Sequence, residues 1–410
     1  MSDPRQHGLA RLATLGWSVY LACSWTWCIG MFLPVLLVRD YGLIGFIAFG
    51  VPNVIGAGAL AWVLRDAAAS RRLVERHRFA CRAFSAVTIL FQGYFAGVVL
   101  TAFGPAVDAW LAAGFLGVLL LLVIAAHGGR TNVTALVVFA VSVGVFAALI
   151  VRSTGWEPRW KAESADPLGS GLIWLAPVMA FGFVLCPYLD ATFHRARQAT
   201  SPAAGRAAFA IGFAALFPVM ILLTYAARDP LSSLGQYAAI GVAIALAVHL
   251  LIQLAFTIAA HSATLERRDR RSVGPDSPIR AIVLTMVLVV PVSFVGVAAS
   301  FVPEMFGLRF TEVGYRVFMA FYGLVFPAYV WLIVIPTRDG HSGTGGDRGR
   351  RKRLIWALAV GVAAPMFWKG FIERQETWLG PGLLIVLLAR LALPRDQEAG
   401  SMDASTSRAV

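Results

Sequence analysis

Twelve stretches of mainly apolar residues, each about 20 residues long, recur along this chain of 410 residues. A helix needs about 20 such residues to cross the roughly 30 Å hydrocarbon core of a bilayer. Hydrophobic residues make up 58% of the chain and charged residues only 14%, a balance that excludes an ordinary soluble domain. We therefore predict an all-α polytopic membrane protein. The expected spans are residues 14–38, 42–64, 83–103, 106–126, 132–151, 169–190, 207–227, 234–263, 280–302, 314–336, 354–371 and 378–394.

Basic residues gather in alternate loops between these spans. If the N-terminus is cytoplasmic, 26 of the 35 Lys and Arg residues fall on the cytoplasmic side. Basic loops are retained on that side, so the pattern predicts a multi-pass protein with both termini in the cytoplasm. Arginine outnumbers lysine 32 to 3, which is typical of a GC-rich bacterial genome and indicates a bacterial inner membrane. The net charge of +13 thus reflects topology, and membrane lipids rather than nucleic acid are the expected partners of the basic loops.

Two polar segments divide the spans into groups of five, five and two. Because five is an odd number, the second group must enter the membrane in the opposite orientation to the first, as in the inverted repeats of many secondary transporters. The predicted segments are a cytoplasmic N-terminus (1–13), a first five-helix repeat (14–151), an external loop (152–168), a second five-helix repeat (169–336), a cytoplasmic linker rich in Gly and Arg (337–353), two peripheral helices (354–394) and a disordered cytoplasmic tail (395–410).

The first span of each group of five contains a Gly followed by a Pro, at Gly30 and Pro34 and again at Gly182 and Pro187. Such pairs disturb the hydrogen-bond ladder of a helix. One interpretation is a matched pair of breaks that face a cavity and present free backbone groups to a ligand. The other is ordinary kinking, because Pro also occurs in other predicted spans, for example at Pro52, Pro218 and Pro291. Both interpretations remain open at this point.

Three stretches resemble the sodium/solute symporter family. The first, SWTWCIGMFLPVLLVRDYG (24–42), is similar to the broken first core helix of that family, and the second, LVERHRFACRAFSAVTILFQGYFAG (73–97), to the basic loop and third core helix. The third, FGFVLCPYLDATFHRA (181–196), is similar to the sixth core helix. Together with the span count the resemblance covers roughly residues 11–336. It implies a leucine-transporter-type fold with a five-plus-five inverted repeat.

The resemblance also implies a sodium site, to which Ala22 and Trp25 would contribute backbone oxygens. The family places hydroxyl groups opposite them in the middle of the eighth core helix. This sequence departs from the pattern, because Leu251 and Ile252 stand where the hydroxyls are expected. The departure favours coupling to protons, or no coupling, over coupling to sodium.

The eighth predicted span carries a polar stripe of His249, Gln253, Thr257 and His261, spaced four residues apart. At about 100° per residue these side chains share one broad face of a helix. A polar face is expensive in lipid, so it is expected to line a substrate or proton pathway. Hydrogen bonds to neighbouring helices are the alternative explanation.

Asp190 follows Pro187 near the cytoplasmic end of the sixth span. One interpretation is that its carboxylate binds a cationic group or takes up a proton. The alternative is that it caps the next helical turn or pairs with Arg195 or Arg197. His194 lies four residues further on the same helical face, so an Asp190–His194 pair is expected.

We interpret the chain as a secondary active transporter, symporter-like, that moves a small organic solute by alternating access. The alternatives are a degenerate transporter fold that serves as a sensor or scaffold and, with less support, an intramembrane enzyme. The sequence has no recognisable catalytic or metal-binding motif, so no cofactor is expected beyond sodium or a proton as coupling ion. The substrate-binding candidates are Ser24, Thr26, Gly30, Gln92, Cys186, Tyr188, His249 and Gln253, and the coupling candidates are Ala22, Trp25, Asp190 and His194.

Overall fold

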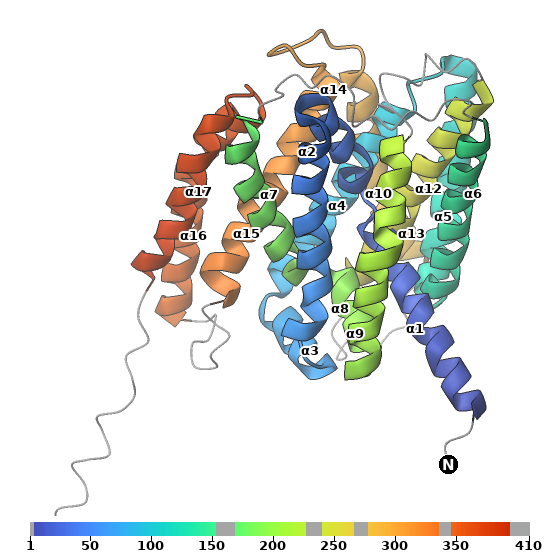
Figure 1. Cartoon of the computed structure of the whole chain (residues 1–410), viewed down its shortest axis with the longest axis horizontal. Coiled ribbons are helices and arrows are strands. Elements are labelled where there is room, and N and C mark those ends of the chain that lie inside the picture. The colour runs from blue at the N-terminus through green and yellow to red at the C-terminus, as the bar shows by residue number, and fades with distance from the viewer. Residues whose placement is uncertain (1–3, 153–168, 227–239, 266–277, 336–345, 394–410) are drawn as a thin grey trace, which may run out of the picture.

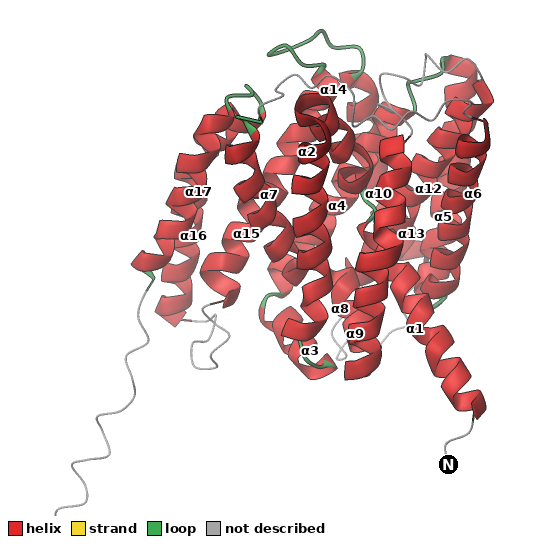
Figure 2. Ribbon diagram, in the orientation of Figure 1, coloured by secondary structure: helices red, strands yellow, loops and turns green. Residues whose placement is uncertain are grey.

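The structure is a computed structural model that describes residues 4–152, 169–226, 240–265, 278–335 and 346–393. In these ranges the chain is almost entirely helical and forms no strand (Figure 2). The α-helices are α1 (Pro4–Trp25), α2 (Cys28–Val63), α3 (Ala67–Arg76), α4 (Arg78–Val99), α5 (Pro105–His127), α6 (Thr131–Arg152), α7 (Leu172–Leu185), α8 (Ala191–Gln198), α9 (Pro202–Ile211), α10 (Phe217–Ala226), α12 (Ile240–Leu265), α13 (Pro278–Ala299), α14 (Phe310–Ala320), α15 (Phe326–Tyr329), α16 (Gly346–Phe371) and α17 (Leu379–Leu388).

Shorter 3₁₀ or π segments, labelled η, interrupt or extend several of these helices. The 3₁₀ segments are η2 (Cys186–Leu189), η7 (Glu376–Trp378) and η8 (Ala389–Ala392). The π segments are η3 (Gly212–Leu216), η4 (Phe321–Val325) and η5 (Val330–Val334). As a result α9 to α10 and α14 to η5 each form one long rod.

Within the described residues, nine helical segments are long and apolar enough to cross a membrane. Large apolar side chains on their outer faces, such as Leu121 on α5 and Val287 on α13, are exposed and suit a lipid environment. The chain is therefore a multi-pass membrane protein. The predicted span 132–151 and residues 378–392 of the last one are also helical, but α6 contributes only a shorter apolar stretch, at 131–145, and α17 is ten residues long. The expected count of twelve stays a prediction.

The helix α2 contains a sharp reversal at Gly42, whose backbone (φ 65°, ψ −153°) is one that side chains with a Cβ rarely adopt. A Cβ added at Gly45 would overlap the carbonyl oxygen of Leu37. In a straight helix these two residues would lie about 12 Å apart along the axis. We therefore describe α2 as two arms, residues 28–41 and 43–63, which correspond to the end of the first predicted span and to the second.

The helices run roughly side by side as a bundle (Figure 1). One end carries α3, α8 and the starts of α1 and α16, and we call it the basic end because Arg residues of α3, α8 and α16 lie there. The other end, the far end, carries Gly42 and the start of α14. Residues 337–345 of the linker expected at 337–353 lie outside the described residues, and the last part of the linker is helical, because residues 346–353 begin α16. Their Arg and Lys side chains are good helix formers.

Glycines bring α4 and α13 into direct backbone contact. A Cβ added at Gly97 would overlap the carbonyl oxygen of Ser293, and one added at Gly296 would overlap that of Tyr94. Gly93, one turn before Gly97, faces Val292. The spacing of Gly93 and Gly97 is the small-xxx-small pattern by which membrane helices approach closely. This contact fixes α4, and with it one wall of the site described below.

Gly97→Ala is expected to destabilise the folded protein by about 1–3 kcal/mol, because the added methyl group must push α13 away from α4. Thermal unfolding in detergent would measure the loss. Gly117→Ala on α5 is the matched control, because nothing lies within 4 Å of its added Cβ. That variant should be neutral or slightly stabilised, since Ala is the better helix former. Equal melting temperatures for the two variants would contradict the described α4–α13 contact.

Candidate functional site

The first expected span is interrupted between α1 and α2. Thr26 and Trp27 lie outside both helices, and the backbone of Trp27 is extended (φ −78°, ψ 177°). The Thr26 hydroxyl donates to the carbonyl of Ala22 at 2.8 Å and so takes up a backbone acceptor at the end of α1. The side-chain carbonyl of Gln92, on α4, accepts from the amide of Cys28 at 3.1 Å and so caps the start of α2.

The sixth expected span is interrupted after α7. A 3₁₀ segment, η2, begins at Cys186 and contains Pro187, and Asp190 then adopts an extended backbone (φ −74°, ψ 109°) before α8 starts. Asp190 caps α8, because its Oδ1 accepts from the Thr192 amide at 2.7 Å and from the Thr192 hydroxyl at 2.6 Å. The expected capping role of Asp190 is therefore confirmed.

The Gly–Pro pairs predicted the place of the second interruption but not of the first. Pro187 lies in η2, directly after α7, whereas Gly182 lies inside α7 and approaches the backbone of η4. Gly30 and Pro34 lie inside α2, where Gly30 is buried and packs against Phe217. At the first interruption, polar groups that hydrogen-bond to backbone thus mark where the helices end.

The two interruptions meet in space. Thr192 Oγ1 lies 3.3 Å from Ser24 Oγ, and the rings of Trp25 and Phe193 are 4.8 Å apart between their centroids. Span eight completes the arrangement through His261, whose ring lies 5.7 Å from that of Trp27. We call the group Ser24, Trp27, Asp190, Thr192 and His261 the break junction.

Two buried polar atoms in the break junction face each other without a hydrogen bond. Asp190 Oδ2 and His261 Nε2 are 3.9 Å apart, and neither has a hydrogen-bond partner among the described residues. Both side chains are fully buried. The other ring nitrogen of His261, Nδ1, lies 3.1 Å from Ser85 Oγ on α4. Buried polar atoms without partners are rare and mark sites for a proton, a water or a ligand.

The predicted Asp190–His194 pair is wrong. His194 Nδ1 lies 2.9 Å from Ser70 Oγ on α3, and its Nε2 lies 2.9 Å from the carbonyl oxygen of Tyr188. The imidazole that faces Asp190 is that of His261, 71 residues further along the chain. His194 instead ties α8 to α3 at the basic end.

The polar stripe of span eight does not face one partner along its length. His249 Nδ1 and Gln253 Nε2 both lie 2.9 Å from Ser142 Oγ on α6, and the Gln253 side chain also lies against the Cys23 thiol near the end of α1. Each four-residue step turns the side-chain direction by about 40° beyond a full turn, so the direction of His261 differs from that of His249 by about 120°. His261 is the residue of the stripe that faces Asp190, and the expected contact of His249 and Gln253 with a solute stays a prediction.

The remaining predicted residues lie around the junction. Cys186 donates from Sγ to the Tyr322 carbonyl at 3.4 Å, and Tyr188 is half-buried. Trp25 donates from its indole to Asn53 Oδ1 at 2.5 Å. The carbonyl oxygen of Ala22, assigned to a sodium site by resemblance, accepts from both the amide and the hydroxyl of Thr26.

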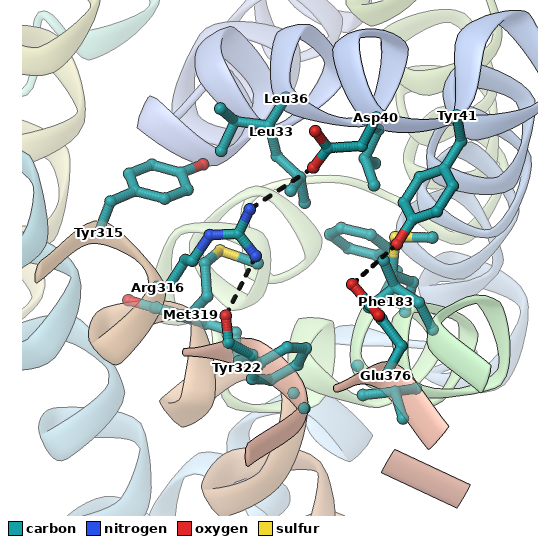
Figure 3. A pocket seen from close by; sticks show the side chains of 18 residues that line it. Leu33, Leu36, Asp40, Tyr41, Phe183, Tyr315, Arg316, Met319, Tyr322 and Glu376 are labelled. Carbon is teal, nitrogen blue, oxygen red and sulfur yellow. Dashed lines mark hydrogen bonds and ion pairs between the residues drawn. The ribbon is translucent and has the colours of Figure 1, made fainter. Parts of the chain in front are cut away.

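Cavities lie on both sides of the break junction. A cavity of about 610 Å³ at the basic end, which we call the vestibule, is lined by residues of α3, α4, α8 and α12 and includes Ser85 and Ala191. A cavity of about 60 Å³ opens toward the far end, between α2, α7 and α14, and includes Tyr322 (Figure 3). The rings of Trp27, Phe84 and Tyr322 pack between them, with centroid distances of 5.3–5.5 Å.

An ion network covers the far-end cavity. Glu312 on α14 accepts from Arg39 at 2.9 and 3.0 Å and from Arg316 at 2.7 and 2.9 Å. Asp40 lies 2.9 Å from Arg39, 3.6 Å from Arg316 and 3.3 Å from Arg374. Figure 3 shows Asp40 and Arg316 at the mouth of the cavity. The network joins α2, α14 and the segment after α16.

Sequence reasoning did not single out Glu312, Arg316 or Ser85. Glu312 and Arg316 carry a local signal, because opposite charges four residues apart on a helix form a pair. Ser85 carries none. In the described part of the chain, no group of three His, Cys, Asp or Glu side chains is arranged to hold a metal ion. In comparisons with protein-family models and with curated proteins, nothing was found that matches this chain.

Proposed function

We propose that the protein is a secondary transporter that binds a small organic solute at the break junction and moves it by alternating access. One observation carries the proposal. Two interrupted helices meet at a buried carboxylate whose second oxygen has no hydrogen-bond partner in the part of the chain that the structure describes. Broken helices whose ends face each other at membrane depth are the usual substrate and ion sites of transporters.

The contacts between helices support a five-plus-five inverted repeat. In such a repeat α4 corresponds to α12 and α5 to α13, so the contact of α12 with α5 requires a contact of α4 with α13. Both contacts occur. Likewise the contact of α1 with α6 has a counterpart between α7 and η4, and that of α1 with α9 has one between α7 and α2. Contacts that recur when each helix is replaced by its counterpart in the other repeat are expected if a pseudo-twofold axis in the membrane plane relates the two repeats.

The unequal volumes of the two cavities support a conformation in which the break junction is accessible from the basic end. The vestibule approaches the break junction through Ser85 and Ala191, whereas the far-end cavity is small and lies under the ion network. By the positive-inside rule the basic end is cytoplasmic, which makes this an inward-facing arrangement in a bacterial inner membrane. Alternating access requires the far end to open while the vestibule closes.

Protons are the coupling ion that fits the break junction best. An ionised carboxylate is costly to bury without a counter-charge, and a proton shared by Asp190 and His261 would remove that cost. The charged side chain nearest in sequence is Arg195 on α8, which lines the vestibule. The titratable groups packed around the pair are Cys81 on α4, Cys186 on η2 and Tyr322 on η4. A solute with an ammonium group would satisfy the same oxygen.

Reciprocal thiol labelling tests the proposal. Ala191→Cys reports on the vestibule and Met319→Cys on the far-end cavity, against four native cysteines that are all buried. The two variants would be labelled with a membrane-impermeant maleimide in inside-out vesicles and in intact cells, respectively. Small amines, amino acids, nucleobases and sugars would be added in turn, with sodium or with a pH gradient. A transported solute should raise labelling at one position and lower it at the other.

The outcomes separate the proposal from its rivals. Reciprocal changes with one solute class, followed by uptake of that solute into proteoliposomes, would support transport. Labelling of Ala191→Cys and Met319→Cys that stays constant under every condition would contradict alternating access. A fixed pair of cavities is the behaviour expected of a sensor or scaffold.

A further inference from the structure

A second large groove lies apart from the break junction, at the basic end between α4, α15 and α16. It encloses about 350 Å³ and falls within the size range of small-molecule sites. Its apolar lining comes from α4, from the rod η4–α15–η5 and from Trp356 of α16. Phe79, at its edge, is 85% exposed. A large exposed aromatic ring next to an apolar groove indicates a surface that is covered in the membrane.

The polarity of the groove changes along its length. Its charged lining residues lie toward the basic end and are Arg76 at the end of α3 and Lys352 and Arg353 in the first turns of α16. Further from the basic end the lining becomes wholly apolar, at Ala83 and Val87 of α4 and at Phe321 and Val325 of η4. The groove therefore runs from a cationic mouth into the depth of the bundle surface.

The charges at the mouth are all positive. Among the described residues that line the groove there is no Asp or Glu. Lys352 is only 4% exposed, so its long side chain is held against the groove rather than extended into water. Burial lowers the pKa of His77 to about 4, so its ring is neutral at pH 7. His77 instead lies 3.2 Å, from Nδ1, from the hydroxyl oxygen of Tyr329.

We propose that this groove binds one anionic phospholipid. Its phosphate contacts Arg76, Lys352 and Arg353, and an acyl chain lies along Ala83, Val87 and Val325. Charge complementarity selects an anionic over a zwitterionic headgroup, and the apolar depth selects a lipid over free phosphate. Basic pockets between membrane helices on the cytoplasmic side are suited to such headgroups. The proposal is independent of any transport activity.

Native mass spectrometry of the full chain tests the proposal. The protein would be purified in detergent and offered phosphatidylglycerol, phosphatidylethanolamine or inorganic phosphate. The expected result is one retained phosphatidylglycerol for each chain, at least fivefold above phosphatidylethanolamine. Lys352→Gln with Arg353→Gln should remove that preference. Arg350→Gln with Arg351→Gln is the matched control, because it removes the same charge from exposed positions of α16 that do not line the groove.

Unfolding of the double variant would also abolish lipid retention, so a second variant blocks the groove in a different way. Ala83→Trp leaves all the cations in place and fills the groove from a partly exposed position of α4. It should reduce phosphatidylglycerol retention about as much as the double substitution does. Equal retention of the two lipids by the unmodified chain would overturn the proposal, as would binding of inorganic phosphate that competes fully with phosphatidylglycerol. Retention by the Ala83→Trp variant equal to that of the unmodified chain would also overturn it.

Discussion

Asp190→Asn is expected to reduce solute uptake by proteoliposomes at least tenfold and to remove its dependence on a pH gradient. Asn caps a helix about as well as Asp, so the start of α8 should keep its hydrogen bond from the Thr192 amide. What the substitution removes is the ionisable oxygen that faces His261. The fold should therefore persist while the coupling group is lost. Uptake would be measured with and without an imposed pH gradient.

Asp108→Asn is the control for this prediction. Asp108 also serves a helix start, because it accepts from the amides of Phe103 and Gly104, but it lies at the start of α5, away from the break junction. Its variant should transport normally. Asp190→Ala should lose the cap as well and cost an additional ~0.5–2 kcal/mol of stability. Gradient-dependent uptake by Asp190→Asn at the unmodified rate would exclude this carboxylate as the coupling group.

Glu312→Gln is expected to open the far end. Glu312 is only 4% exposed and accepts hydrogen bonds from both Arg39 and Arg316. Removal of one partner from a buried ion pair costs about 3–5 kcal/mol when the other charge is left unpaired. Asp40 still lies near Arg39 and Arg316 in this variant, so the loss should fall below that range. The conformation in which the ion network is formed and the far end is closed should lose that stabilisation. Labelling of a Met319→Cys reporter from outside the cell should rise several-fold, and the melting temperature should fall.

Glu304→Gln provides the comparison at the same end of the molecule. Glu304 is exposed in the connection between α13 and α14, so its neutralisation should change neither labelling nor stability. If Glu312→Gln proves too unstable to purify, Arg39→Gln removes a partner whose side chain is 37% exposed and should show the same direction with a smaller effect. Unchanged labelling of Met319→Cys in both network variants would show that these ion pairs do not control access.

The helices themselves could be predicted from the sequence, because length and apolarity alone decide whether a segment can cross a bilayer. The place of the second interruption could be predicted too, because Pro187 lies within it, but the place of the first could not. Gly30 and Pro34 were the visible signal, but both lie within α2. The interruption lies at Thr26 and Trp27, where a side-chain hydroxyl and a residue of another helix, Gln92, take up backbone groups. A partner that is 64 residues away leaves no trace in local sequence.

The contacts of the site also depend on residues that are distant in the sequence, so local patterns predicted them only in part. The four-residue spacing on α12 predicted a polar face, and all four of its side chains are buried. Which of them faces the interruptions depends on the helices packed around α12, because the stripe turns as it rises. The ion network is a longer-range case, since Arg39 and Glu312 are 273 residues apart. Only its local pairs were accessible to pattern reasoning, namely Glu312–Arg316 within α14 and the adjacent Arg39–Asp40.

The reversal at Gly42 has a mechanical consequence. The turn between the arms of α2 is a single residue, and Gly45 packs against Leu37. The connection is therefore short and tightly packed, and we expect the two arms to move together. The first arm forms one wall of the far-end cavity through Leu33 and Leu37. Gly56 in the second arm rests directly on the backbone of Phe183, which lies in another wall.

These two walls are therefore in close backbone contact with each other. Under the proposed alternating access, the far end would open between α2 and α14, where Asp40 faces Arg316 beside the cavity. The ion network would then act as a latch between these helices, and the close turn at Gly42 would make both arms of α2 and the neighbouring α7 move together.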